Sequence, residues 1–200
     1  DADPIGICGS GIIDLICQMI LTGIIDRRGK IHRDIDNRRI RFNEYDMGEY
    51  VLAFKEEYNL EQDITVNEVD IDNFIKAKGA IYSGASVLIE SLGMDFSVID
   101  KVYIAGGIGN NLNIENSILI GLLPDIEREK FVYIGNSSLV GSYLALISKD
   151  AKKKVQEIGT EMTYVELSVY PTYMDEFISA CFLPHTNIEQ FPTVKAILVE

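Results

Sequence analysis

The feature that most constrains this chain is a strand that runs directly into a glycine turn, at residues 101–111. The apolar strand is followed at once by Gly106, Gly107 and Gly109, and a helical pattern comes next. In α/β proteins, ligands bind at the carboxyl ends of such strands. Glycine also lets the backbone approach a ligand closely. The sequence therefore predicts that main chain here contacts a flat or anionic small molecule.

The elements expected from residue 70 onward alternate between helix and strand. Apolar spacing predicts a long helix to about residue 91, and then strands at 98–105, 130–134 and 163–167 separated by helices at 113–122, 139–148 (continued by 151–158) and 171–182. A last short strand is expected at 196–199. This alternation predicts an α/β fold in which a central sheet has helices on both faces.

The region before this alternation is less regular. A strongly apolar helix is expected at 9–23, and short strands are expected within a charged segment at 40–42, 50–54 and 64–66. We therefore predict a core lobe built from residues 1–24 and 93–200. Residues 25–92 would form a smaller, irregular α+β subdomain that carries the long helix, 70–92.

Charge limits the classes of partner. The chain has 18 basic and 31 acidic residues, a net charge of −13. An acidic surface argues against binding to nucleic acid or to an anionic membrane, and it suits a soluble protein with a basic protein partner. Neither a signal peptide nor an apolar run of membrane-spanning length is present, so we expect a cytoplasmic protein. Because the chain starts Asp-Ala-Asp-Pro without Met, we expect a fragment of a longer protein.

Cysteine and histidine give no catalytic or metal-binding pattern. Cys8, Cys17 and Cys181 form no CxxC, so we predict no metal or cluster ligands in this chain. Cys8 precedes a helix, where the pKa of a thiol can fall, but we expect a buried, inert thiol. The chain has no Ser/His/Asp or Cys/His set, and we therefore predict no catalytic residue.

Two further glycine turns, at 6–11 and 134–138, also open helices. A helix N-terminus offers free N–H groups to an anion, although glycine and serine also serve simply as turn and cap residues. None of the turns is a P-loop, and none matches a dinucleotide fingerprint. On the long helix, Lys76, Lys78 and Ser83 are candidates to line a purine or ribose pocket, the alternative being a solvated helix face.

Five segments together resemble a known family. They are GICGSGIID at 6–14, AKGAIYSG at 77–84, YIAGGIGNNLNIENSILIGLLPD at 103–125, FVYIGNSSLVGSYLAL at 131–146 and FLPHT at 182–186. In this order they resemble the carboxyl-terminal part of the reductive activators of corrinoid proteins, which share a domain with the activators of methylamine methyltransferases. This resemblance implies an actin-like, ribonuclease-H-like ATPase lobe of the actin, sugar-kinase and heat-shock-chaperone superfamily.

The resemblance also implies a function. Such activators use ATP and an iron–sulfur cluster to return an inactive Co(II) corrinoid to Co(I), so the implied partner is a corrinoid protein. By resemblance, Gly106, Gly107, Gly109 and Asn110 would form the adenosine turn. Lys76, Lys78 and Ser83 would face the base or ribose from the long helix.

The chain departs from the superfamily in what it lacks. The phosphate-binding hairpins and the cluster cysteines are absent, so ATP, Mg²⁺ and the cluster are expected only in the full-length protein. This chain would then supply the adenosine-side half of a nucleotide cleft. One alternative is a non-catalytic lobe that binds a partner protein, and another is a small-molecule kinase or radical-dehydratase activator. The sequence leaves a homodimer open.

Overall fold

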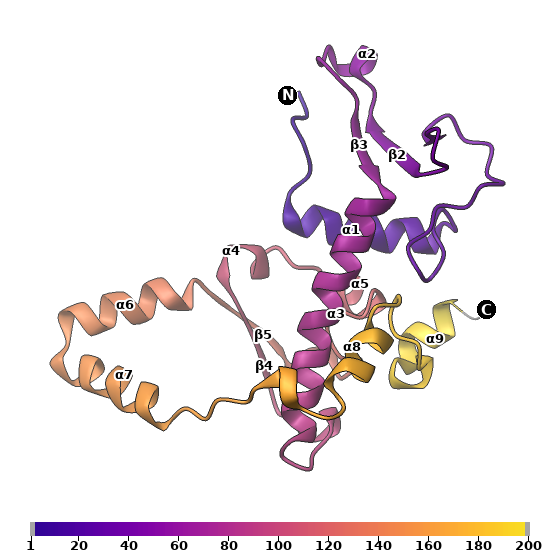
Figure 1. Cartoon of the computed structure of the whole chain (residues 1–200). Helices are drawn as coiled ribbons and strands as arrows, with labels where there is room; N and C mark the ends of the chain where they lie inside the picture. Colours follow the sequence, from indigo (N-terminus) through magenta and orange to yellow (C-terminus); the bar gives the residue numbers. More distant parts are fainter. Residues whose placement is uncertain (1–2, 199–200) are drawn as a thin grey trace.

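A computed structural model describes residues 3–198 (Figure 1). Its helices are α1 (Gly9–Leu21), α2 (Lys55–Tyr58), α3 (Glu68–Glu90), α4 (Gly106–Gly109), α5 (Ile114–Leu119), α6 (Ser137–Ile147), α7 (Lys149–Glu161), α8 (Tyr173–Ala180) and α9 (Pro192–Leu198). Its strands are β1 (Ile40–Phe42), β2 (Gly48–Ala53), β3 (Ile64–Asn67), β4 (Val102–Ala105) and β5 (Phe131–Gly135). Short 3-10 helices are η1 (Phe96–Val98), η2 (Arg128–Lys130), η3 (Leu167–Val169) and η4 (Ile188–Gln190).

The described strands form two separate sheets. β1, β2 and β3 make an antiparallel sheet in that order, beside the N-terminal end of α3 (Figure 1). β4 and β5 pair in parallel, with Val102 opposite Phe131 and Ala105 opposite Gly135. The three short strands expected before residue 70 are confirmed. The strands that lead into the glycine turns after Ala105 and at 134–138 are confirmed as well.

The long helix α3 connects the two regions. It begins after Asn67, whose side chain accepts hydrogen bonds from the backbone N–H groups of Val69 and Asp70. Asp70 in turn accepts from the Asn67 N–H, and this reciprocal capping box fixes the first turn. The helix leads away from the end of β3 and packs along α8. The division into a core lobe and a subdomain at 25–92 stays a prediction.

The hydrophobic core lies where α1, α3, α5 and the C-terminal segment meet. Ile16, Ile71, Ile118 and Phe191 come from these four regions and are almost fully buried. Burying one side chain of this size stabilises a fold by about 1.5–3 kcal/mol. The apolar spacing of α1 therefore predicts its packing correctly, because its buried positions follow one helical face.

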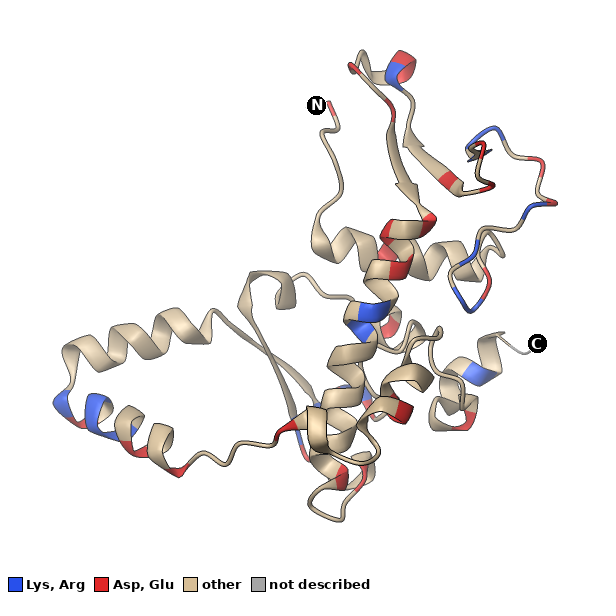
Figure 2. Cartoon of the chain, in the orientation of Figure 1, with Lys and Arg blue, Asp and Glu red and all other residues tan. Residues whose placement is uncertain are grey.

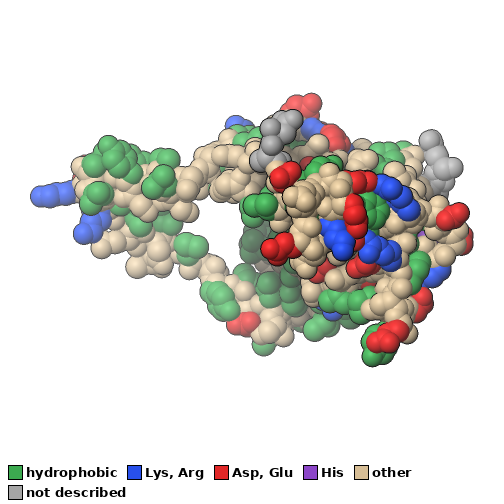
Figure 3. All heavy atoms as spheres, turned by 90° about the horizontal axis from the view of Figure 1, so that it is seen from above, with side chains coloured by type: hydrophobic (Ala, Val, Ile, Leu, Met, Phe, Trp, Pro, Cys, Tyr) green, Lys and Arg blue, Asp and Glu red, His purple; other side chains and the backbone are tan. Residues whose placement is uncertain are grey.

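Helices α6 and α7 form a hairpin that extends away from this core (Figure 1). No residue of α6 is buried, and Figure 3 shows hydrophobic side chains spread over this projecting part. The most exposed of them include Leu139, Tyr143, Leu146 and Ile147. A helix that is apolar without being buried is typical of a segment that needs a further packing partner.

Two of the expected strands are wrong. Residues 163–166 have no regular structure and lead into η3, where the Glu166 carboxylate accepts from Ser168. Their alternation would suit a half-buried strand, but Tyr164 is exposed and no described strand lies beside it to pair. Residues 196–198 belong to α9, because Pro192 starts a helix and Val194 is buried on its inner face. Val199, the end of that expected strand, lies outside the described residues.

The strand expected at 98–105 is present as β4 but is shorter than expected. Residues 96–98 form η1, capped by Asp95, so the strand begins only at Val102. None of the helices in residues 3–198 combines the length and the apolar character that a membrane crossing requires.

Candidate functional site

The glycine turn after β4 has a distinct requirement at each glycine. Gly106 has φ of +91°, a conformation that other residues adopt only with strain. Gly109 is buried, and a Cβ there would lie 2.7 Å from Ile104 Cγ2. At Gly107, by contrast, a Cβ would meet no atom within 4 Å and the backbone is helical. Gly106 and Gly109 are therefore explained by the fold itself, whereas Gly107 is not.

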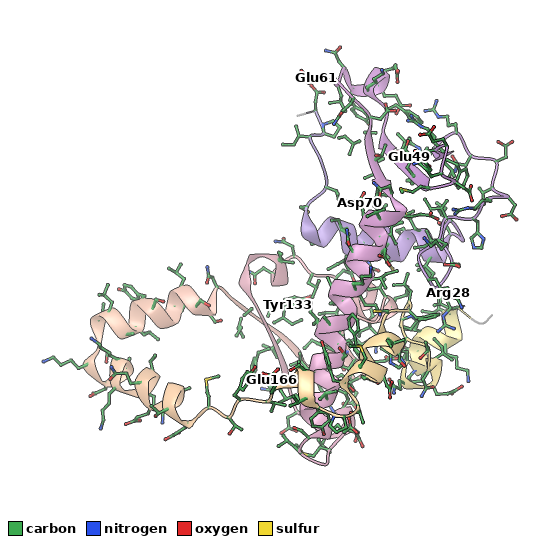
Figure 4. All side chains as sticks on the ribbon, viewed as in Figure 1. Arg28, Glu49, Glu61, Asp70, Tyr133 and Glu166 are labelled. Atoms are coloured by element: carbon green, nitrogen blue, oxygen red, sulfur yellow. The ribbon has the colours of Figure 1, made fainter. Side chains whose placement is uncertain are left out.

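The turn after β5 lies beside this one. The parallel register places Gly135 opposite Ala105, so both turns leave the same edge of the sheet. Gly135 also has positive φ, +66°, and the Asn136 side chain caps α6 by accepting from Leu139 N at 3.0 Å. The Tyr133 hydroxyl, labelled in Figure 4, donates to the carbonyl of Leu112 and ties β5 to the segment after α4.

The glycine turn at 6–11, near the N-terminus, lies beside the turn that follows β4. It opens α1, and a Cβ on Gly9 would lie 3.4 Å from Ile108 Cδ1 of α4. Side chains of α1 and α5 hold this arrangement together. The Asn116 amide accepts from the Cys17 thiol at 3.2 Å and donates to Asp14. Three turns that are far apart in the sequence thus converge on one edge of the molecule.

The thiol expected to be buried at this junction is in fact exposed. Cys8 is the residue before α1, and its Sγ lies 3.4 Å from the hydroxyl of Ser10. That hydroxyl lowers the pKa of the Cys8 thiol, and the N–H of Gly11 acts in the same direction. The expectation was wrong because the residue stands outside the buried face of α1, which begins at Ile13.

The three candidate residues of the long helix do not act as one group. The Lys78 ammonium is buried and donates to the backbone carbonyls of Phe182 and Pro184, after α8. Ser83 is also buried, and its hydroxyl lies 3.4 Å from the carbonyl of Ala80. Lys76 is exposed and forms an ion pair with Asp72 one turn earlier. Helical spacing alone could not separate these surroundings, because the carbonyls that bind Lys78 lie 104 and 106 residues further along the chain.

The segment 182–185, within the FLPHT motif, has a structural role that the sequence did not reveal. Lys78 and Arg27, from distant parts of the chain, donate to its successive carbonyls, and Leu183 N donates to Arg27 O. His185, within the same segment, is buried beside Glu176 of α8. The only sequence signal for this arrangement was the resemblance of the motif to the family.

The α/β fold is of the actin-like, or ASKHA, type. More particularly, the chain belongs to the family described as the C-terminal domain of RACo, the ASKHA domain, whose model matches residues 1–195. The structure is similar to that of a protein named reductive activator for corrinoid, iron-sulfur protein. The TM-score is 0.88 and the identity 50%, over 96% of this chain and 30% of that one.

Two curated proteins are also similar to this chain in sequence. The corrinoid activation enzyme RamQ of Eubacterium limosum is 32% identical over 181 residues, 88% of this chain and 30% of that protein. A [Co(II) methylated amine-specific corrinoid protein] reductase of Methanosarcina barkeri is 24% identical over 161 residues, 80% of this chain and 26% of that protein. The chain thus spans less than a third of these relatives. The family resemblance and the actin-like α/β fold are confirmed.

Proposed function

We propose that this chain is the carboxyl-terminal part of an ATP-dependent activator that returns Co(II) corrinoid to Co(I), and that it supplies the adenosine-side half of the nucleotide cleft. The names of the three relatives support the first part, since each refers to the activation or reduction of a corrinoid protein. The partner we propose is accordingly a corrinoid protein.

The convergence of the three glycine turns is the observation that carries the second part. Turns at strand ends and helix starts offer backbone N–H groups, and glycine permits close approach of a planar ligand. Gly107 supports this best, because neither its backbone conformation nor its packing requires glycine. The space beside Gly107 is open, since an added Cβ would meet no atom within 4 Å, and bound ATP would supply the free energy for an uphill electron transfer.

We assign different roles to the residues of the proposed nucleotide cleft. Gly106 and Gly109 shape the turn, Gly107 provides the contact surface, and Asn110, the C-cap of α4, offers an amide to the ligand. Lys76 is exposed but paired with Asp72, and we propose that it exchanges this ion pair for a contact with the ribose or phosphate. Lys78 and Ser83 are buried, and we propose that they act indirectly by fixing α3.

An iron–sulfur cluster does not fit the cysteines of this chain. Cys8 is exposed at the start of α1, Cys17 is buried against Asn116, and Cys181 lies at the end of α8 near Gly79. They come from separate sites, whereas a cluster needs several thiolates around one point. We therefore place the cluster of the proposed activator elsewhere in the full-length protein.

The oxidation state of cobalt provides a direct test of this proposal. The reduced full-length protein is mixed with a Co(II) corrinoid protein, and Co(I) is followed by its absorbance with and without Mg-ATP. We expect Co(I) formation to depend on ATP and to fall about tenfold or more in Gly107→Val, because the added side chain costs at least about 1.4 kcal/mol of nucleotide binding at subsaturating ATP. Gly159→Val, in open space on α7, is the control. Reduction that is independent of ATP would contradict the proposal.

A second function is favoured by one observation, the exposed apolar surface of α6 and α7. If the domain were a non-catalytic lobe, this surface would bind a partner protein. In the proposed activator, the same surface packs against the remainder of the longer protein. Full-length protein that binds no nucleotide but retains a partner through this hairpin would favour the non-catalytic lobe.

A further inference from the structure

A cavity of about 650 Å³ lies on the other side of α3 from the exposed face that carries Ile81 and Leu88. It is bounded by the C-terminal half of α3, by η1, by the segment 124–126 and by α8. This volume is in the range of cavities that bind small organic molecules. None of the residues of the glycine turns lines it.

The lining combines an apolar surface with many carboxylates. The apolar part is formed by Tyr82, Ile89, Met94, Phe96, Pro124 and Ile126. The acidic part is formed by Glu90, Asp95, Asp125, Asp175 and Glu176, and the lining contains no Lys or Arg. Figure 2 shows acidic positions near the lower end of α3 and on α8.

Only one of these five carboxylates is neutralised by a cation. Asp125 is 1% exposed and pairs with Arg128 at 2.7 Å. Glu90 accepts from the Thr172 hydroxyl, and Asp95 accepts from Ser97 N in capping η1. These neutral donors leave the negative charge in place. Within residues 3–198, no Lys or Arg lies within ion-pair distance of the other four acids.

Glu176, a partly buried acid of the lining, has one carboxylate oxygen without a hydrogen-bond partner among the described residues. His185 is 2% exposed, and its Nδ1 accepts from Asn187 N, so its proton is on Nε2. That atom lies 3.7 Å from Glu176 Oε1, too far for a hydrogen bond, and neither atom has another partner in the described chain. The imidazole N–H, a long polar contact rather than a hydrogen bond, and the Ser86 hydroxyl together outweigh burial and lower the pKa of the Glu176 carboxyl. An ionised, under-satisfied carboxylate therefore borders the cavity.

We propose that this cavity is a binding site for a small organic cation, a molecule with protonated amines on an apolar body. The four unpaired carboxylates would bind the amines, and the apolar surface would bind the methylene groups. The rings of Tyr82 and Phe96, 5.7 Å apart, add a surface that attracts cations. A metal ion is a poorer occupant, because no group of three His, Cys, Asp or Glu in residues 3–198 is arranged to hold one. Phosphate would be repelled, so the site is separate from the proposed nucleotide cleft.

The probe that we choose is spermidine, titrated into the full chain by calorimetry at low and at physiological salt. The test variant is Glu90→Gln/Asp175→Asn, which changes two acids of the lining that are exposed, and we expect it to fold as the wild type does. The control is Glu44→Gln/Glu61→Gln, which removes the same charge from exposed positions outside the cavity; Figure 4 labels Glu61 far from α8. Calcium chloride is titrated separately.

We expect saturable binding by the wild type and the control, and an affinity about tenfold lower in the cavity variant, since two ion contacts are lost. The proposal is overturned if the two variants lose affinity equally, because binding would then reflect net charge alone. It is also overturned if the wild type binds no spermidine, or binds calcium and not spermidine. Glu176→Gln gives an independent check, because a loss of affinity with unchanged melting temperature places the ligand in this cavity.

Discussion

At the scale of single residues, Lys78 is the most unusual group in the chain. Its side chain is 1% exposed, and burial lowers the pKa of its ammonium to about 7. The carbonyls of Phe182 and Pro184 accept from it, so the side chain connects α3 to the segment after α8. A lysine that the sequence suggested as a ligand contact is therefore a structural residue that joins two distant segments.

This burial predicts a pH dependence. Below pH 7 Lys78 is protonated in both states, so the folded protein bears the full desolvation penalty. Between pH 7 and the ordinary lysine pKa of about 10.4, the unfolded chain holds the proton and the folded chain does not, so stability rises with pH. The free energy of unfolding of the wild type, minus that of Lys78→Met, should rise by about 1 kcal/mol per pH unit between pH 7 and 9. Urea denaturation at several pH values measures it, and a flat or falling difference would refute it.

At the scale of elements, α3 was expected to begin at Asp70, and it begins at Glu68 because Asn67 is the cap. Substituting Asn67 by Ala removes the acceptor for Val69 N and Asp70 N. We expect this change to lower the free energy of unfolding by about 1 kcal/mol. Asn73→Ala, at an exposed position inside the same helix, is the control and should be neutral or slightly stabilising. Equal effects of the two substitutions in thermal unfolding would contradict the capping role.

Periodicity predicted most of the elements because most of them bury a face. Helix α1 has a continuous apolar face, and β4 and β5 carry short apolar runs that end in glycine. The expected strand at 163–167 failed because alternation records which faces could be buried, not whether a neighbour strand is present. The strand expected at 196–199 was wrong for a different reason. That prediction did not take into account that Pro192 can start a helix, and residues 196–198 belong to this helix.

At the scale of the whole molecule, the sequence identified each glycine turn but not their convergence. That convergence depends on the pairing of Ala105 with Gly135 and on the close approach of α1 to Ile108 at Gly9, and no local pattern specifies either. The acidic cavity was missed for the same reason, because its carboxylates come from α3, the cap of η1, the segment 124–126 and α8. The family, in contrast, could be recognised from motifs, since each of them lies within one short segment.

The central claim is that the converging glycine turns form the adenosine side of a nucleotide cleft. Calorimetric titration of the full-length protein with Mg-ATP tests it most directly, using Gly107→Val beside Gly159→Val. Both glycines have open space around them, so the two variants should melt at the temperature of the wild type. We predict that Gly159→Val binds as the wild type does and that Gly107→Val binds about tenfold or more weakly. Unchanged binding by a folded Gly107→Val protein would contradict the account.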